Sequence, residues 1–151
     1  MINSGIYVLW LHLPKEAVLA VGSLGTFSFP PGIYAYVGSA QRNLQQRLAR
    51  HRRAEKKLRW HIDYLRAQAN CLGAVVFLGA PKDAECRLAE HIRQLPGASL
   101  PAGNFGASDC SCPAHLVHLS GLAPDLVALS HAVHNVQLGA AKSLAFFDAG
   151  D

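Results

Sequence analysis

The main structural signal in the chain lies in Gly32-Ile33-Tyr34-Ala35-Tyr36-Val37-Gly38-Ser39-Ala40. Residues 33–37 are rich in β-branched and aromatic side chains, which favour a strand, and Gly38-Ser39 ends the run. Because side chains alternate between the two faces of a strand, Tyr34 and Tyr36 are predicted to lie on the same side of a sheet.

A helix is predicted from about Asn43, where the hydrophobic pattern changes to the helical period. Leu44 and Leu48 fall on one face of this helix, and Arg47 and His51 lie one turn apart on another face. Tyrosine, guanidinium and imidazole groups therefore meet where the strand ends and the helix begins. This combination of groups is typical of a site for phosphate chemistry.

The composition indicates one globular domain. The chain has 151 residues, of which 50% are hydrophobic and 16% are charged. No apolar run reaches the ~18 residues of a membrane span, and the N-terminus lacks a signal-peptide pattern. We therefore expect a cytoplasmic protein without membrane contact, in which the cysteines are reduced thiols. These cysteines are Cys71, Cys86, Cys110 and Cys112.

Positive charge is concentrated in one segment of a chain whose formal net charge is +4. Between Arg42 and Arg59 Glu55 is the only acidic residue, whereas a solvated helix face usually carries both signs of charge. This segment predicts a polyanionic partner, nucleic acid and most simply DNA. The residues assigned to nucleic-acid binding are Arg42, Arg50, Arg53, Lys56, Lys57 and Arg59.

The remaining pattern predicts an α/β fold, in which a small central antiparallel-to-mixed β-sheet is flanked by helices. Further strands are expected at residues 5–13, 17–21, 74–78 and 115–119, and further helices at about 58–70 and 82–95. Residues 120–151 are apolar and nearly uncharged. They are expected to form a helical extension, with a helix over about 124–138, packed on the same domain.

Several short motifs, taken in chain order, resemble one known superfamily. Gly5-Ile6-Tyr7 and Tyr36-Val37-Gly38 resemble the two halves of the GIY-YIG nuclease signature. Three further blocks resemble the Uri-type subgroup of small bacterial and archaeal members, namely Gly22-Ser23-Leu24-Gly25, Arg59-Trp60-His61-Ile62-Asp63-Tyr64-Leu65, and Phe105-Gly106-Ala107-Ser108-Asp109-Cys110-Ser111-Cys112 with His115-Leu116. The resemblance covers residues 4–119 and implies a GIY-YIG-like nuclease domain over that range.

The resemblance implies a metal-dependent endonuclease with five catalytic candidates. Tyr7 would act as general base or orient the attacking water with Tyr36 beside it, although a free tyrosine, with a pKa of ~10, needs a nearby cation or metal for that task. Arg47 would clamp the phosphate, and His51 would orient the water or protonate the leaving group. His61 is equally well interpreted as a catalytic or as a structural histidine.

The resemblance also implies one carboxylate that holds a single divalent ion, Mg²⁺ or Mn²⁺. The candidates are Glu85 and Glu90. Leu88 and Ile92 follow Glu85 by three and seven residues, which places Glu85 at the edge of a buried helical stripe. We therefore predict Glu85 as the ligand and Glu90 as a surface residue.

The loop over residues 96–114 offers weaker candidates, which are Asn104, Ser108 and Asp109. The pattern Cys110-x-Cys112-x-x-His115 has the residue types of a zinc site, but its spacing is tighter than the usual Cys-x2-4-Cys. Small buried thiols are therefore expected here in preference to zinc.

The expected reaction is endonucleolytic hydrolysis that leaves a 5′-phosphate and a 3′-hydroxyl. Two other classes of protein stay open at this point. One is a non-catalytic nucleic-acid-binding module on the same fold, and the other is an interaction domain stabilised by zinc.

Overall fold

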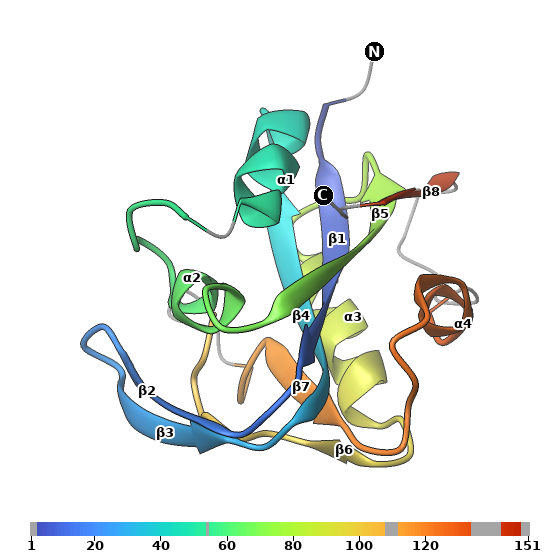
Figure 1. Ribbon diagram of the computed structural model, residues 1–151. Helices are drawn as coiled ribbons and strands as arrows, with labels where there is room; N and C mark the ends of the chain where they lie inside the picture. Colours follow the sequence, from blue (N-terminus) through green and yellow to red (C-terminus); the bar gives the residue numbers. More distant parts are fainter. Residues whose placement is uncertain (1–2, 54, 108–111, 134–142, 149–151) are drawn as a thin grey trace.

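The computed structural model describes residues 3–53, 55–107, 112–133 and 143–148. In this part of the chain a six-stranded sheet has the order β6-β7-β4-β1-β5-β8, and a separate hairpin pairs β2 with β3. All pairings are antiparallel, and helices lie on both faces of the sheet (Figure 1). The elements are β1 Gly5–Leu13, β2 Ala17–Val21, β3 Gly25–Phe29, β4 Gly32–Ala40, α1 Leu44–Arg52, α2 His61–Arg66, β5 Asn70–Leu78, α3 Ala84–Arg93, β6 Ala98–Ser99, β7 Leu116–Leu119, α4 Leu126–His131 and β8 Ser143–Asp148.

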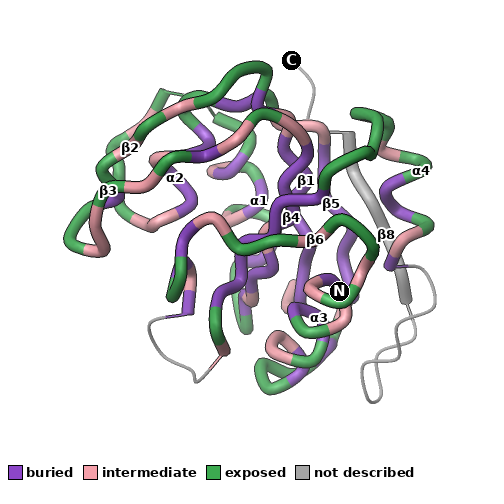
Figure 2. Tube along the Cα trace, turned by 90° about the horizontal axis from the view of Figure 1, so that it is seen from below, coloured by how far each residue is buried: buried purple, intermediate pink, exposed green. Residues whose placement is uncertain are grey.

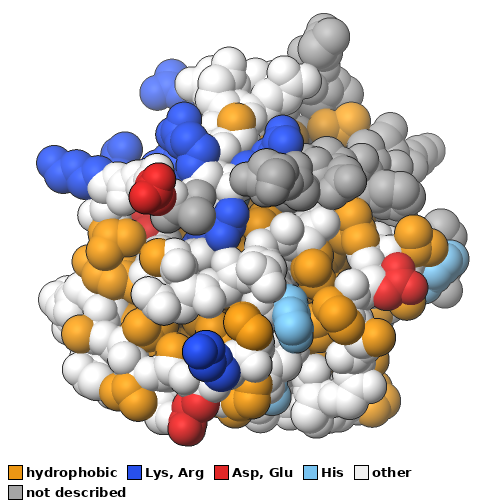
Figure 3. All heavy atoms as spheres, in the orientation of Figure 1, with side chains coloured by type: hydrophobic (Ala, Val, Ile, Leu, Met, Phe, Trp, Pro, Cys, Tyr) orange, Lys and Arg blue, Asp and Glu red, His pale blue; other side chains and the backbone are white. Residues whose placement is uncertain are grey.

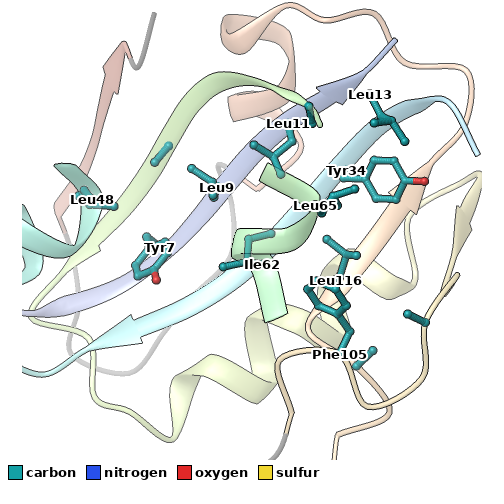
Figure 4. Packing of buried hydrophobic residues seen from close by; sticks show 14 of the residues in the cluster. Tyr7, Leu9, Leu11, Leu13, Tyr34, Leu48, Ile62, Leu65, Phe105 and Leu116 are labelled. Carbon is teal, nitrogen blue, oxygen red and sulfur yellow. The ribbon is translucent and has the colours of Figure 1, made fainter. Parts of the chain in front are cut away.

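The central strands β1 and β4 are buried on both faces, so each reads as a nearly continuous apolar run (Figure 2). Odd-numbered residues of β1, from Tyr7 to Leu13, enter one core with α1 and α2, and Figure 4 shows Tyr7 toward one end of this core. Even-numbered residues, from Ile6 to Trp10, enter a second core with α3 and α4. The sheet is thus the middle layer of three.

The predicted fold class, a small β-sheet flanked by helices, is confirmed. The helix predicted over 58–70 is shorter in the structure, where α2 begins at His61. The Asp63 carboxylate fixes this start, because it accepts hydrogen bonds from the backbone N–H groups of Arg59 and Trp60. The predicted end of this helix is wrong, since Asn70 already begins β5.

Three strands were not predicted, and the shortest is β6, which pairs with β7 inside the range 96–114 that was interpreted as a loop. Gly25–Phe29 was interpreted as a loop, but it pairs with β2 as β3 and places Phe29 in the core. Residues 120–151 contain the helix α4, which packs Leu129 against the second core, and also β8, which pairs with β5 at the edge of the sheet. Part of the predicted helix over 124–138 lies outside the described residues. No helix in the described ranges is long and apolar enough to cross a membrane.

Gly38 is required by the cross-strand neighbour that covers it. Tyr7 on β1 is paired directly with Gly38 on β4, and the Tyr7 ring lies so close that a Cβ atom on residue 38 would clash with it. Tyr7 of the first half-signature therefore packs directly on Gly38 of the second, and its position requires a residue without a side chain there.

Replacing this glycine should destabilise the fold. Gly38→Ala forces the buried Tyr7 ring to move, and overpacking of this kind costs about 1–3 kcal/mol. The control is Gly103→Ala, because a Cβ at residue 103 meets no atom within 4 Å. Urea unfolding should show a clear loss for Gly38→Ala and a change within about 0.5 kcal/mol for Gly103→Ala. Equal stabilities would contradict this packing argument.

Candidate active site

Tyr7 and His51 are joined across the interface between the sheet and α1. The Tyr7 hydroxyl lies 2.7 Å from Nε2 of His51, and both residues are buried. Burial, together with nearby Tyr36, raises the pKa of Tyr7 well above its ordinary value, whereas Arg47 opposes this shift. The phenol is therefore protonated and donates its hydrogen to Nε2.

His51 is held in its neutral form. Burial and the positive charge of Lys56 lower the pKa of His51 to about 3, against the opposing charge of Asp63. Nδ1 of His51 is buried and has no hydrogen-bond partner among the described residues. His51 does not line the pocket described below, so it acts on that pocket through Tyr7 and has no direct access to a water molecule or a leaving group there.

Arg47 is fixed by two contacts that leave part of its guanidinium facing the pocket. Nη1 donates to the backbone carbonyl of Ser39 at 2.5 Å, and the guanidinium carbon lies 4.8 Å from the centroid of the Trp60 ring. The first contact joins α1 to the end of β4, and the second is a cation–π contact. A guanidinium held in this way is prepared to bind a phosphate oxygen.

A pocket of about 360 Å³ opens beside Arg47. β7 pairs with β4 only as far as Tyr36, so the following residues of β4 border the pocket. Glu85, in the first turn of α3, reaches this pocket from the other layer, whereas Glu90 is exposed and is not among the lining residues. The lining residues are Tyr7, Tyr36, Gly38, Ser39, Gln41, Arg47, Trp60, Lys82, Glu85 and Gly106.

His61 supports the wall of the pocket and does not line it. Its Nδ1 accepts a hydrogen bond of 2.9 Å from the backbone N–H of Gly106, and burial lowers the pKa of His61. Gly106 has a positive φ of 72°, and a Cβ there would lie only 2.8 Å from a ring carbon of Tyr36. His61 thus holds the loop against Tyr36, which fits its structural interpretation better than a direct catalytic role.

Two of the cations assigned to nucleic acid are engaged inside the protein. Arg50 donates to both oxygens of Asp63, each at 2.8 Å, and Lys56 donates to the carbonyls of Arg50 and Arg53. Burial lowers the pKa of Lys56 to about 8, while Asp63, 3.8 Å away, opposes the shift. Burial alone would raise the pKa of Asp63, but the bonds from Arg50 and from the Trp60 and Arg59 backbones hold it below its ordinary value.

The other cations of the segment are exposed. Arg42, Arg53, Lys57 and Arg59 carry solvent-facing side chains, and Figure 3 shows Lys and Arg side chains gathered over α1 and the connection to α2. A second hollow, of about 570 Å³, is lined by Arg50, Arg53, Lys56, Lys57, Leu58 and Arg59. Trp60 links the two hollows, because its ring lines the first one and lies 5.6 Å from the guanidinium of Arg59.

The weaker candidates of the 96–114 loop do not join the pocket where the structure describes them. Asn104 is exposed, with a positive φ of 63°, and its N–H donates to the carbonyl of Pro113 at 2.7 Å, so it is a turn residue. Ser108, Asp109 and Cys110 lie outside the described residues. His118, three residues after His115, contacts the carbonyl of Pro31 at 2.9 Å and is not part of the cysteine–histidine group described below.

The structure also forms a group that the sequence did not predict. Cys86 on α3 and Cys112 before β7 are joined in a disulfide, and their ligand atoms and that of His115 lie within 4.8 Å of one another. This pairing differs from the expectation of four reduced thiols. Trp60, Lys82 and Gln41 are further pocket residues that the sequence analysis did not assign, although Trp60 stands inside a block that it quoted.

Fold and pocket define an α/β protein whose central antiparallel strands present tyrosines to a polar pocket with arginine, lysine and glutamate. A family model described as "Domain of unknown function DUF123" matches residues 6–138. The chain therefore belongs to this family. A search of curated proteins and a search of solved structures found no match.

The buried neutral His51 predicts a specific dependence of stability on pH. Its pKa is about 3 in the folded protein and about 6.5 in an unfolded chain, so acid protonates the unfolded chain first. The stabilisation is complete above about pH 6.5 and is lost as the pH falls toward 3. Between pH 7 and 5 this group alone should remove about 2 kcal/mol.

Urea unfolding of wild type and His51→Gln at pH 7 and pH 5 isolates this contribution, because every other titrating group is common to both proteins. His51→Gln should be less stable at pH 7 and should lose about 2 kcal/mol less than wild type on acidification. His131→Gln, at an exposed position on α4, should follow the wild-type slope. Parallel slopes for wild type and His51→Gln would refute the assignment.

Proposed function

We propose that the protein is a GIY-YIG-type, metal-dependent endonuclease of the Uri-type subgroup that hydrolyses phosphodiester bonds, with DNA as the expected substrate. One observation carries the proposal. Tyr7 and Tyr36 of the two half-signatures, Arg47 of α1 and Glu85 of α3 line the same pocket although they come from four different elements. Those are the positions that the resemblance assigns to the reaction.

Phosphodiester hydrolysis needs a water that loses a proton, a cation near the charge that develops on the phosphoryl oxygens, and help for the leaving oxygen. Arg47 supplies the cation, since it is always charged and already held by Ser39 and Trp60. Lys82 lines the same pocket and adds a second positive charge near the phosphate. Both charges favour a phosphate in the pocket and stabilise the additional charge of the transition state.

Tyr7 lines the pocket and orients the attacking water. Its hydroxyl donates to Nε2 of His51, so the phenol oxygen is left as an acceptor for a hydrogen of the water. A direct tyrosinate is disfavoured, because burial raises the pKa of Tyr7. Proton transfer on to His51 is disfavoured as well, because its pKa is lowered to about 3, so His51 acts as a positioning partner that fixes the phenol one step from the substrate.

The donor set of the pocket fits a single Mg²⁺ or Mn²⁺ ion. Glu85 contributes a carboxylate, and such ions keep most of their water and add substrate phosphate oxygens as ligands. A bound ion would neutralise phosphate charge and lower the pKa of a coordinated water. Glu85 would hold the ion, while Arg47 and Tyr7 act on the phosphate and on the water.

The exposed cations give the nucleic acid a path to the pocket. The hollow lined by Arg53, Lys57 and Arg59 adjoins Trp60, which is itself part of the pocket wall. Phosphates that follow these side chains would bring the scissile bond to Arg47. Because Arg50 and Lys56 are engaged with Asp63 and with backbone carbonyls, they support this surface rather than contact the substrate.

Cleavage assays test the site directly. Labelled single- and double-stranded DNA and RNA are incubated with Mg²⁺, Mn²⁺ or EDTA, and products with 5′-phosphate ends are expected only with metal.

Arg47→Ala should lower the cleavage rate by ~10²–10³, because a fixed charge contact to the transition state is lost. Glu85→Ala should abolish cleavage while DNA binding persists, since it removes a negative charge from a phosphate site.

Glu90→Ala is the matched control on the same helix and should stay near wild-type activity. An inactive Glu90→Ala protein together with an active Glu85→Ala protein would show that Glu90, and not Glu85, is the carboxylate that holds the metal ion. Wild-type protein that binds DNA but cleaves none of the substrates with either metal would instead favour the non-catalytic binding module.

Salt dependence tests the path for nucleic acid. Each phosphate contact contributes about 0.7–0.9 to the slope of log affinity against log salt, so Lys57→Gln/Arg59→Gln should reduce the slope by about 1.4–1.8. Lys15→Gln/Arg87→Gln removes the same charge from exposed positions elsewhere and should leave the slope unchanged. Identical slopes for the two double variants would place the nucleic acid on another surface.

A further inference from the structure

The first turn of α3 and the loop before β7 bring three metal-ligating side chains together outside the pocket. Cys86 comes from α3, whereas Cys112 and His115 come from the segment that leads into β7, 26 and 29 residues after Cys86. Sγ of Cys86 lies 3.8 Å from Nε2 of His115. His115 is fully buried, and Cys86 is partly buried.

We propose that, with its two thiols reduced, the Cys86–Cys112–His115 cluster binds a Zn²⁺ ion. Two thiolates and an imidazole are the ligand types of tetrahedral structural zinc. Zn–S bonds of about 2.3 Å and Zn–N bonds of about 2.0–2.1 Å place sulfur and nitrogen ligands about 3.6 Å apart in such a site. The observed 3.8 Å between Sγ of Cys86 and Nε2 of His115 is close to that value.

A second observation points to a metal on Nε2 of His115. Nδ1 of the same ring lies 3.4 Å from a carboxylate oxygen of Glu85. Metal-bound histidines regularly donate the other ring N–H to a carboxylate, which fixes the tautomer and strengthens the ligand. In His115 the Glu85 carboxylate lies on the Nδ1 side, at an ion-pair distance from which such a hydrogen bond can form, and a cysteine sulfur lies on the Nε2 side.

The position of Cys86 supports a thiolate. It is the third residue of α3, where the unpaired backbone N–H groups of a helix start favour negative charge. Two thiolates and a neutral histidine balance the charge of a divalent zinc ion. The fourth position of the ion is filled by a ligand outside these three.

The disulfide and the zinc site are alternative states of the same two sulfurs. The Cα atoms of Cys86 and Cys112 are 6.3 Å apart, a separation from which side-chain rotation reaches either arrangement. A dithiol reductant supplies two electrons and two protons to the S–S bond, and zinc then displaces the two thiol protons to solvent. Zinc would tie the loop to α3 in place of the disulfide.

The full-length protein is reduced, stripped of metal with a chelator, and titrated with Zn²⁺ or Co²⁺. We expect about one equivalent of tightly held zinc, and thiolate-to-cobalt charge-transfer absorption with Co²⁺, which an oxygen-only site such as the Glu85 pocket does not produce. Cys86→Ser, Cys112→Ser and His115→Ala should each weaken zinc binding at least tenfold. Cys71→Ser, which alters a cysteine outside the cluster, should bind as wild type does.

Thiol alkylation of wild-type protein keeps the test independent of variant folding. Zinc should protect Cys86 and Cys112, but not Cys71, from an alkylating reagent, and protein oxidised to the disulfide should bind no zinc at this site. Reduced wild-type protein that takes up far less than one equivalent, or a Cys86→Ser protein with wild-type affinity, would overturn the proposal.

Discussion

The hydrogen bond between the Tyr7 hydroxyl and Nε2 of His51 is the contact on which the pocket depends. It joins the central strand β1 to α1, and it forms only because Gly38 leaves room for the Tyr7 ring. With α1 fixed in this way, Arg47, one turn before His51, reaches the carbonyl of Ser39 at the end of β4. The orientation of the guanidinium is therefore a consequence of packing between sheet and helix.

A buried carboxylate supports this contact from behind. Asp63 accepts bonds from Arg50 and from two backbone N–H groups at the start of α2, and it attracts Lys56. The charge of Lys56 is one of the reasons why His51 stays neutral and can accept the hydrogen bond from Tyr7. The basic segment between Arg42 and Arg59 is thus divided into two parts. Arg50 and Lys56 make contacts inside the protein, whereas cations such as Lys57 and Arg59 face solvent.

The sequence predicted what depends on local pattern. Strand alternation placed Tyr34 and Tyr36 on the same side of the sheet, and helical period selected Glu85 over Glu90 as the carboxylate facing the interior. The alternation of Thr26-Phe27-Ser28-Phe29 was present but was overridden by the neighbouring glycine and prolines, so β3 was missed. The roles of Arg50 and Lys56 were not predictable, because they depend on Asp63, whose place beside α1 is fixed by tertiary packing alone.

The same limit explains why the sulfur cluster escaped notice. Cys-x-Cys is a poor zinc pattern by spacing, and nothing local indicates that a cysteine 26 residues earlier completes it. The structure makes the first turn of α3 a shared boundary, because Glu85 lines the pocket and the next residue, Cys86, contacts the loop. His115 lies near both side chains, at 3.4 Å and 3.8 Å. The position of the pocket carboxylate therefore depends on how that loop is held to the helix.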